Sequence, residues 1–99
     1  MGRQRFEHLF AELSVACGRL VPRFQLWLYL REHDADPEAL SLREALGFCD
    51  DGLVPFLAAE GLSLSRWQRR KFRHAIAGFD PDLTSPAEIL ARLDGEEST

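Results

Sequence analysis

Apolar residues recur at intervals of three and four positions through the first part of the chain, between residues 3 and 17. This spacing predicts an α-helix with one side packed against a core, and Gly18 follows it as a helix stop. The residues that form the apolar side are Phe6, Leu9, Phe10, Leu13, Ala16 and Cys17. On the same helix His8 and Glu12 are four residues apart, which is typical of pairing on a helix surface.

A second helix is predicted from Pro22 to about His33, with Pro22 in its first turn, where the missing N–H group costs nothing. Residues 24–30 are apolar on nearly every side of this helix. We therefore expect it to be the most buried helix, with Trp27 and Leu30 in the core. A strand is the alternative for residues 24–30. We reject it because Pro22 and the polar residues 31–33 suit helix ends, and because no second strand is predicted to pair with it.

The middle of the chain, residues 34–61, reads as short helices separated by turns. After a turn at residues 34–37, Asp36 and Ser41 are both placed to cap a helix. They predict a helical segment over 37–46, either continuous or broken in two. Gly47 is predicted to end it, and the composition of residues 49–52 predicts a turn. A short helix follows over residues 54–60 and ends at Gly61.

Residues 65–79 combine a strong helix signal with a concentration of positive charge. Ser65 and Gln68 fit a capping box, and Gly78 fits a helix stop. The stretch holds five of the 12 Lys and Arg residues and none of the 16 Asp and Glu residues, so its formal charge is +5 and that of the remaining chain is −9. At 100° per residue, the side predicted to pack inward consists of Gln68, Phe72, Ala75, Ile76 and Phe79. The opposite side consists of Arg66, Arg69, Arg70 and Arg73, and the strip beside it holds Trp67, Lys71 and His74.

The last predicted helix begins at Ser85, with Pro86 in its first position and Glu88 in its third. It follows a turn at residues 80–82 and ends at residues 94–95, and its expected core face is Ile89, Leu90 and Leu93. The sequence contains no internal repeat and no alternation of predicted strands and helices. The expected fold class is all-α: a compact orthogonal bundle of five or six short helices in a single domain over residues 1–95, with a disordered acidic tail at 96–99.

Composition narrows the functional classes. At 99 residues the chain can form one domain, and its 45% hydrophobic and 28% charged residues are typical of a folded globular protein. The net charge of −4 disfavours a general nucleic-acid binder, because a duplex would repel the whole molecule. Cys17 and Cys49 are expected to be buried free thiols. No apolar run is long enough to cross a membrane, so we expect a cytoplasmic protein without a membrane partner.

Residues able to bind metals or to catalyse reactions do not occur at recognised spacings. The densest group of possible ligands is Glu32, His33, Asp34 and Asp36, which has neither a zinc spacing nor the pattern of a calcium loop. The glycines are separate helix stops and turns rather than a phosphate-binding loop. A cysteine nucleophile would need a histidine beside it in space, which the spacing does not predict. We therefore expect no cofactor, no metal site and no enzymatic activity.

The charge-segregated helix carries the functional prediction. We expect a non-catalytic interaction module, such as an adaptor, accessory or regulatory subunit, that docks an acidic protein surface through the basic helix 65–78. The predicted partner-binding residues are Arg66, Trp67, Arg69, Arg70, Lys71 and Arg73. Two positions are open for Trp67: an exposed anchor, or a side chain folded back onto Leu64, and burial is favoured. The oligomeric state is not predicted.

Two alternatives to this prediction stay open. Residues 54–78 resemble a helix-turn-helix unit, because a helix ending in glycine is followed by a Leu-Ser turn and a capped basic helix. Binding of nucleic acid through this unit is therefore the second functional hypothesis. The chain's own carboxylates could also neutralise the arginines, and those placed to do so are Asp50, Asp51, Glu60, Asp80 and Asp82.

Overall fold

The computed structural model describes residues 2–79 and 87–91, and every regular element in these ranges is helical. The elements, in chain order, are α1 (Gly2–Cys17), α2 (Arg23–Glu32), the 3₁₀ turn η1 (Pro37–Ala39), α3 (Leu42–Gly47), the π-helical turn η2 (Phe48–Gly52), α4 (Leu53–Ala59) and α5 (Arg66–Ala77). Residues 87–91 are also helical. The prediction of an all-α compact bundle is confirmed.

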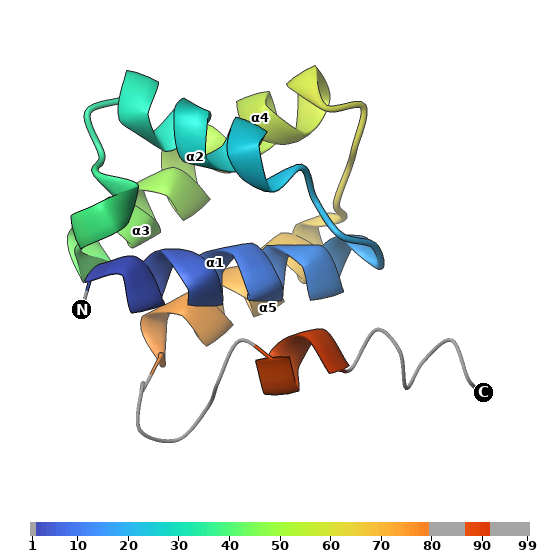
Figure 1. The fold of residues 1–99 in the computed structure, drawn as a ribbon. Coiled ribbons are helices and arrows are strands. Elements are labelled where there is room, and N and C mark those ends of the chain that lie inside the picture. The colour runs from blue at the N-terminus through green and yellow to red at the C-terminus, as the bar shows by residue number, and fades with distance from the viewer. Residues whose placement is uncertain (1, 80–86, 92–99) are drawn as a thin grey trace.

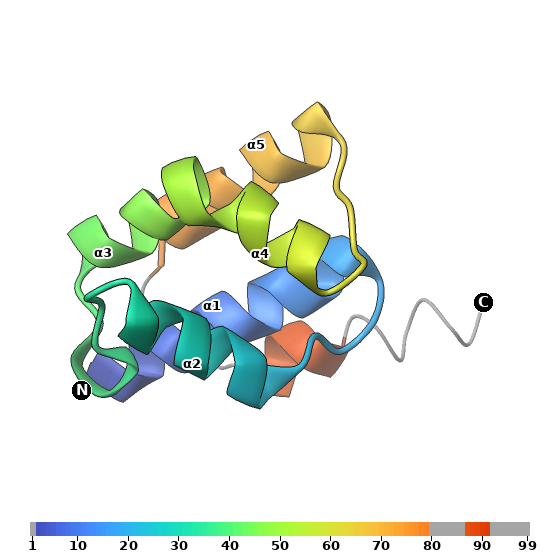
Figure 2. The same cartoon turned by 90° about the horizontal axis from the view of Figure 1, so that it is seen from above.

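The helices are arranged around α1 (Figure 1). Seen from above, the run from α3 to α4 lies between α2 and α5, and α1 passes beneath (Figure 2). α1 packs against η1, α3 and α5, and α5 packs against α3 as well as α1. Because α5 is held from two sides, its outer surface is presented by a supported helix rather than by a loop.

α1 is the most buried helix, and the prediction that α2 would be the most buried is wrong. Both the apolar side and the flanks of α1 are closed off from solvent; the buried residues are Phe6, His8, Leu9, Phe10, Ala11, Glu12, Leu13 and Ser14. α2 buries only Leu26 and Leu30, and Phe24 remains 65% exposed. A chain of this length forms too few helices to surround more than one of them, and α1 takes that place. Leu30 is in the core as predicted, whereas Trp27 is half-buried and packs against the core.

The predicted surface pair of α1 lies in the interior instead. His8 and Glu12 are both buried, and His8 Nε2 lies 3.7 Å from Glu12 Oε1. The ring of Phe79 stacks on the His8 ring at a centroid distance of 4.2 Å, and this contact closes the site from the α5 side. The spacing of His8 and Glu12 within one helix identified the pair. Their burial involves Phe79, which lies two residues beyond the end of α5 and could not be placed from the spacing.

The caps predicted for residues 37–46 are confirmed, and the segment is broken in two. Asp36 caps η1, because its carboxylate accepts a hydrogen bond from the Glu38 N–H group at 3.0 Å. Ser41 and Glu44 form a capping box at the start of α3: Ser41 Oγ accepts from the Glu44 N–H group at 3.0 Å, and Glu44 Oε1 accepts from the Ser41 N–H group at 2.9 Å.

The predicted helix stop at Gly47 and the predicted turn at residues 49–52 are wrong. α3 continues through η2 into α4, and Gly47 has helical dihedral angles of −59° and −41°. The Phe48 ring packs edge-on against the rings of Tyr29 and Phe56, with centroids 5.9 and 6.0 Å away. Burial of this aromatic cluster outweighs the turn preference of the Asp-Asp-Gly sequence that follows.

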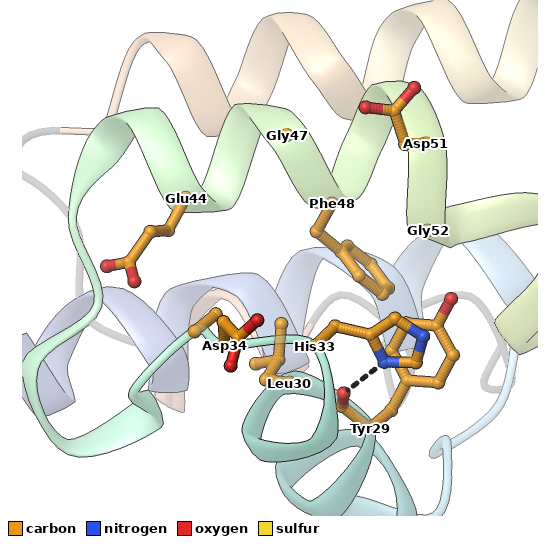
Figure 3. Close-up of a pocket in the computed structure, with 10 residues that line it drawn as sticks. Tyr29, Leu30, His33, Asp34, Glu44, Gly47, Phe48, Asp51 and Gly52 are labelled. Atoms are coloured by element: carbon orange, nitrogen blue, oxygen red, sulfur yellow. Dashed lines mark hydrogen bonds between the residues drawn. The ribbon is translucent and has the colours of Figure 1, made fainter.

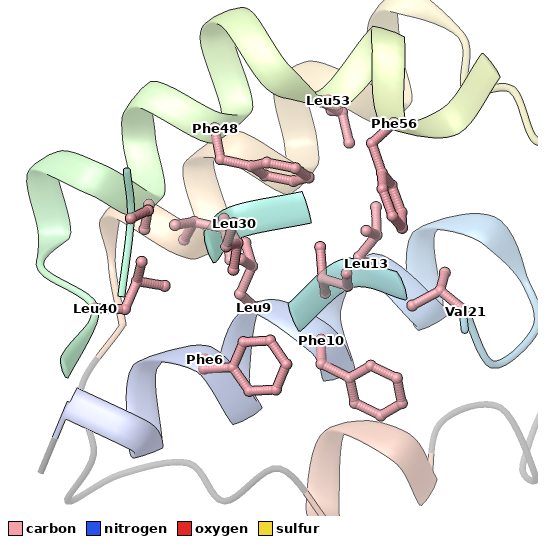
Figure 4. Packing of buried hydrophobic residues seen from close by; sticks show 14 of the residues in the cluster. Phe6, Leu9, Phe10, Leu13, Val21, Leu30, Leu40, Phe48, Leu53 and Phe56 are labelled. Carbon is pink, nitrogen blue, oxygen red and sulfur yellow. The ribbon is translucent and has the colours of Figure 1, made fainter. Parts of the chain in front are cut away.

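The core fills the space between these helices (Figure 4). Phe48, Leu53 and Phe56 approach from the α3–α4 run, and α1 contributes residues such as Leu9 and Leu13. Ile89 in the 87–91 segment is buried and Leu90 is half-buried, as predicted. The predicted turn at 80–82, the helix start at Ser85 and Pro86, Leu93, the helix end at 94–95 and the tail at 96–99 lie outside the described residues. None of the helices in the described ranges is long and apolar enough to cross a membrane.

Cys17 and Cys49 are free thiols as predicted, but they are half-buried rather than buried. Burial raises the pKa of the Cys17 thiol. It raises the pKa of the Cys49 thiol to about 12, and the neighbouring Asp50 charge adds to the effect. Both thiolates are therefore scarce at neutral pH, and the thiolate is the reactive form of cysteine.

Candidate partner-binding surface

α5 forms as the sequence predicts. The Gln68 N–H group donates to Ser65 Oγ at 3.1 Å, and the Ser65 N–H group donates to Gln68 Oε1 at 2.8 Å, which completes a capping box. Phe72 and Ile76 are buried and fix the helix to the core. Gln68 was expected on the inward side but is exposed, because its side chain turns back to cap the helix.

Trp67 is 69% exposed. The prediction that favoured its burial against Leu64 is therefore wrong, and Leu64 packs half-buried against the core. Trp67 is the second residue of α5, and this first turn lies at the edge of the bundle (Figure 2). An indole this exposed is uncommon, since tryptophan is highly buried on average.

Arg66 and Arg70 lie beside Trp67 and are both exposed. The three side chains line an open concavity of about 430 Å³. Neither arginine forms an ion pair within the described part of the chain. We call Arg66, Trp67 and Arg70 the Trp67 surface.

Arg73 is occupied by the fold itself. Its Nε donates to Asp50 Oδ1 at 2.7 Å, and its second guanidinium nitrogen donates to Asp50 Oδ2 at 3.2 Å. This bidentate bond holds the pKa of the Asp50 carboxyl below its ordinary value and raises the pKa of Arg73. For Arg73, the hypothesis that the chain's own carboxylates neutralise the arginines is therefore correct.

The other two predicted contact residues lie apart from the Trp67 surface. Arg69 is half-buried rather than fully exposed, and its Nε atom is buried without a hydrogen-bond partner among the described residues. Lys71 is exposed and, with His74 and Glu12, lines a cavity of about 460 Å³ between α1 and α5. The structure thus separates the six predicted residues into one compact group of three and three residues directed elsewhere.

The helix-turn-helix-like unit departs from the geometry of that motif. Six residues, 60–65, join α4 to α5, whereas the motif uses a turn of about three or four residues. Gly61, with φ of 70°, ends α4 as predicted. α4 packs against η2, however, while α5 packs against α1 and α3. α5 is therefore not supported by the preceding helix in the way a recognition helix is.

A second concavity, which the sequence did not predict, lies at the C-terminal end of α2 (Figure 3). It has a volume of about 340 Å³ and reaches from Tyr29 and His33 on α2 and its cap to Glu44 and Phe48 on the α3–α4 run. The sequence signal is present in Phe48 and Gly52, but Gly52 falls in the turn predicted at residues 49–52 and Phe48 directly precedes it. Among the described residues, no group of three His, Cys, Asp or Glu side chains is placed to hold a metal ion.

Comparison of the chain with protein-family models, with curated proteins and with solved structures finds no match. Its function is therefore inferred from the geometry and chemistry of the described residues.

Proposed function

We propose that the protein is a non-catalytic interaction module that docks an acidic protein surface through the Trp67 surface. The observation that carries this proposal is the 69% exposure of Trp67 beside two exposed arginines that form no ion pair among the described residues. Tryptophan and arginine are the residue types most enriched among those that dominate binding energy at protein interfaces. An adaptor, accessory or regulatory subunit is the class of protein that such a surface serves.

The exposed indole supplies the apolar part of the interface. Burying a large apolar side chain is worth about 1.5–3 kcal/mol relative to leaving it in water. Trp67 contributes little of this to folding because most of its surface stays in solvent. A partner that covers the ring gains the burial energy with little loss of backbone freedom, because α5 is already capped and packed.

The two arginines supply the charge preference. Arg66 and Arg70 are four residues apart on one helix, so their like charges repel by a few tenths of a kcal/mol in the free protein, on the order of other helical pairs. A carboxylate placed between them relieves that repulsion and accepts hydrogen bonds from planar guanidinium groups. A cationic partner surface is excluded by the same charges.

The test uses Trp67 as its own reporter. In a Trp27→Phe background Trp67 is the only tryptophan, since the chain contains two. The probe is a synthetic amphipathic helical peptide with glutamates on either side of a leucine row. We expect its binding to shift the Trp67 emission to shorter wavelength, because the indole leaves water. Arg66→Glu combined with Arg70→Glu should abolish the shift.

The matched control is Arg19→Glu combined with Arg43→Glu, which changes the net charge equally at two exposed arginines outside the Trp67 surface. This variant should still bind the peptide. If it loses binding to the same extent, only the overall charge matters and the proposed surface is wrong.

A DNA duplex provides the test of the second hypothesis. Binding to a duplex would fall by orders of magnitude, about 10³ or more, between low and moderate salt if six or more phosphates were neutralised. Duplex binding with such a slope, together with no peptide binding, would replace the proposed function by nucleic-acid binding.

A further inference from the structure

The cavity at the C-terminal end of α2 has the size and lining of a small-molecule site. Its volume of about 340 Å³ lies within the range of roughly 300–1,000 Å³ that ligand pockets occupy. Leu30, Ala35 and Phe48 give it an apolar interior, and polar side chains stand at its edges. This combination of an apolar interior with a few converging polar groups is typical of binding sites.

Aromatic rings form much of its wall (Figure 3). The Tyr29 ring stacks on the His33 ring at a centroid distance of 4.0 Å and meets the Phe48 ring edge-on at 5.9 Å. Gly52 permits this arrangement, because a Cβ atom there would lie 3.1 Å from Tyr29 Cε1. The faces of aromatic rings carry negative electrostatic potential and attract cations.

The charged groups around the cavity all have the same sign. They are Asp34, Glu44 and Asp51, and no lysine or arginine of the described residues lines it. The Asp51 and Glu44 carboxylates both point away from the rings, which leaves Asp34 as the carboxylate that matters (Figure 3). The Glu44 carboxylate turns back to the start of α3, where it accepts the capping bond from the Ser41 N–H group. The C-terminal end of α2 adds the negative end of a helix dipole.

His33 adds an oriented hydrogen-bond acceptor. Its Nδ1 lies 2.8 Å from the Tyr29 carbonyl oxygen, which can only accept, so Nδ1 carries the hydrogen. In the neutral ring Nε2 is then an acceptor. The Asp34 carboxylate and the acceptor nitrogen of the neutral His33 ring therefore favour a positively charged donor over an anion.

We propose that this cavity binds a small organic cation, an ammonium group carried on an apolar body. The carboxylate of Asp34 binds the ammonium group, and the Tyr29 and Phe48 rings contact the apolar body. A metal ion fits less well, because hard cations require several more oxygen ligands than one carboxylate provides. This site is separate from the Trp67 surface and does not depend on the function proposed for it.

The test compares three probes that share a ring and differ in charge: benzylamine, benzyl alcohol and benzoate. Binding is followed through the amide resonances of Gly47 and Gly52, which line the cavity, in nitrogen-15 correlation spectra. Benzylamine should bind at least about fivefold more tightly than benzyl alcohol, given the strength of cation–π contacts and charge-assisted hydrogen bonds. Benzoate should not bind. Equal affinities for the amine and the alcohol would overturn the proposal.

Asp34→Asn tests the charged contact without disturbing the fold. Asp34 has φ of 62°, a conformation that asparagine adopts as readily as aspartate. The variant should lose most of the preference for benzylamine over benzyl alcohol and should leave the affinity for the alcohol unchanged. The matched control is Glu32→Gln, which removes one exposed carboxylate from the same end of α2 outside the cavity. An equal loss in the control, or chemical-shift changes centred elsewhere, would overturn the site.

Discussion

Alanine at Gly47 and alanine at Gly52 should change stability in opposite directions, although both glycines lie in one helical run. Their φ angles of −59° and −100° are accessible to alanine. Alanine in a helix is more favourable than glycine by about 0.5–1 kcal/mol, because it loses less backbone entropy on folding. At Gly47 nothing opposes this gain, since a Cβ atom there would meet no atom within 4 Å.

At Gly52 the added methyl group collides with two rings. Its Cβ atom would lie 3.0 Å from Phe48 Cδ1 and 3.1 Å from Tyr29 Cε1. Phe48 is buried, and Tyr29 is packed against the rings of His33, Phe48 and Phe56, so neither can move away without disturbing the cluster. Overpacking of this kind costs about 1–3 kcal/mol. Because the helix-propensity gain is common to both variants, their difference in unfolding free energy should equal this cost.

Urea unfolding followed by far-ultraviolet circular dichroism measures that difference. The slope of the free energy against urea concentration should be the same in both variants, because neither changes the surface exposed on unfolding. In thermal melts a difference of 1 kcal/mol corresponds to about 4–8 °C for a domain of this size. Equal stabilisation by both alanines would show that the rings of Phe48 and Tyr29 do not lie against Gly52.

Three further predictions follow from individual residues. Leu30→Ala should lower the unfolding free energy by about 2–5 kcal/mol, because Leu30 is 2% exposed in the core, and a loss below about 1 kcal/mol in urea titration would contradict that position. The pKa of Cys49 is about 12 in the folded chain against an ordinary 9.0, so the stability it contributes is present below about pH 9 and is lost as pH rises towards 12; Cys49→Ala should flatten this part of the stability profile. Arg73 holds the pKa of Asp50 below 3.8. The stability that this ion pair contributes is therefore present above about pH 4 and is lost as pH falls through the lowered pKa. Asp50→Asn should remove it from acid melting curves, and an unchanged acid profile would show that the ion pair does not form in solution.

Local signals predicted the start, the end and the buried anchors of α5, and the reason is physical. A capping box, an amphipathic face and a terminal glycine all act within a few residues of one another, so the sequence contains every partner that they need. The same holds for the caps at Asp36 and Ser41. Elements whose stability is set by neighbours close in sequence can be located without knowledge of the fold.

The features that the sequence did not predict depend on distant partners. The apolar residues on nearly every side of α2 do not reveal how many other helices pack against α2, and Phe24 is exposed to solvent. Arg73 and Asp50 are 23 residues apart, and only the packing of α5 beside η2 brings them together. The exposure of Trp67 also depends on where the first turn of α5 lies in the bundle, and the residues next to Trp67 in the sequence do not specify this.

The π-helical turn also explains a discontinuity in the pattern of buried residues. Projected at about 100° per residue, Ala45, Phe48 and Gly52 cluster around one direction, whereas Leu53, Phe56 and Leu57 cluster about 100° further round. That offset equals one residue, which is the amount by which a π turn exceeds an α turn. The turn therefore acts as an absorbed single-residue insertion that keeps two helical faces in phase with one core. Deleting one residue between 48 and 52 would restore regular α-helical hydrogen bonding there and would also remove the 100° offset, so both buried faces would still meet the core.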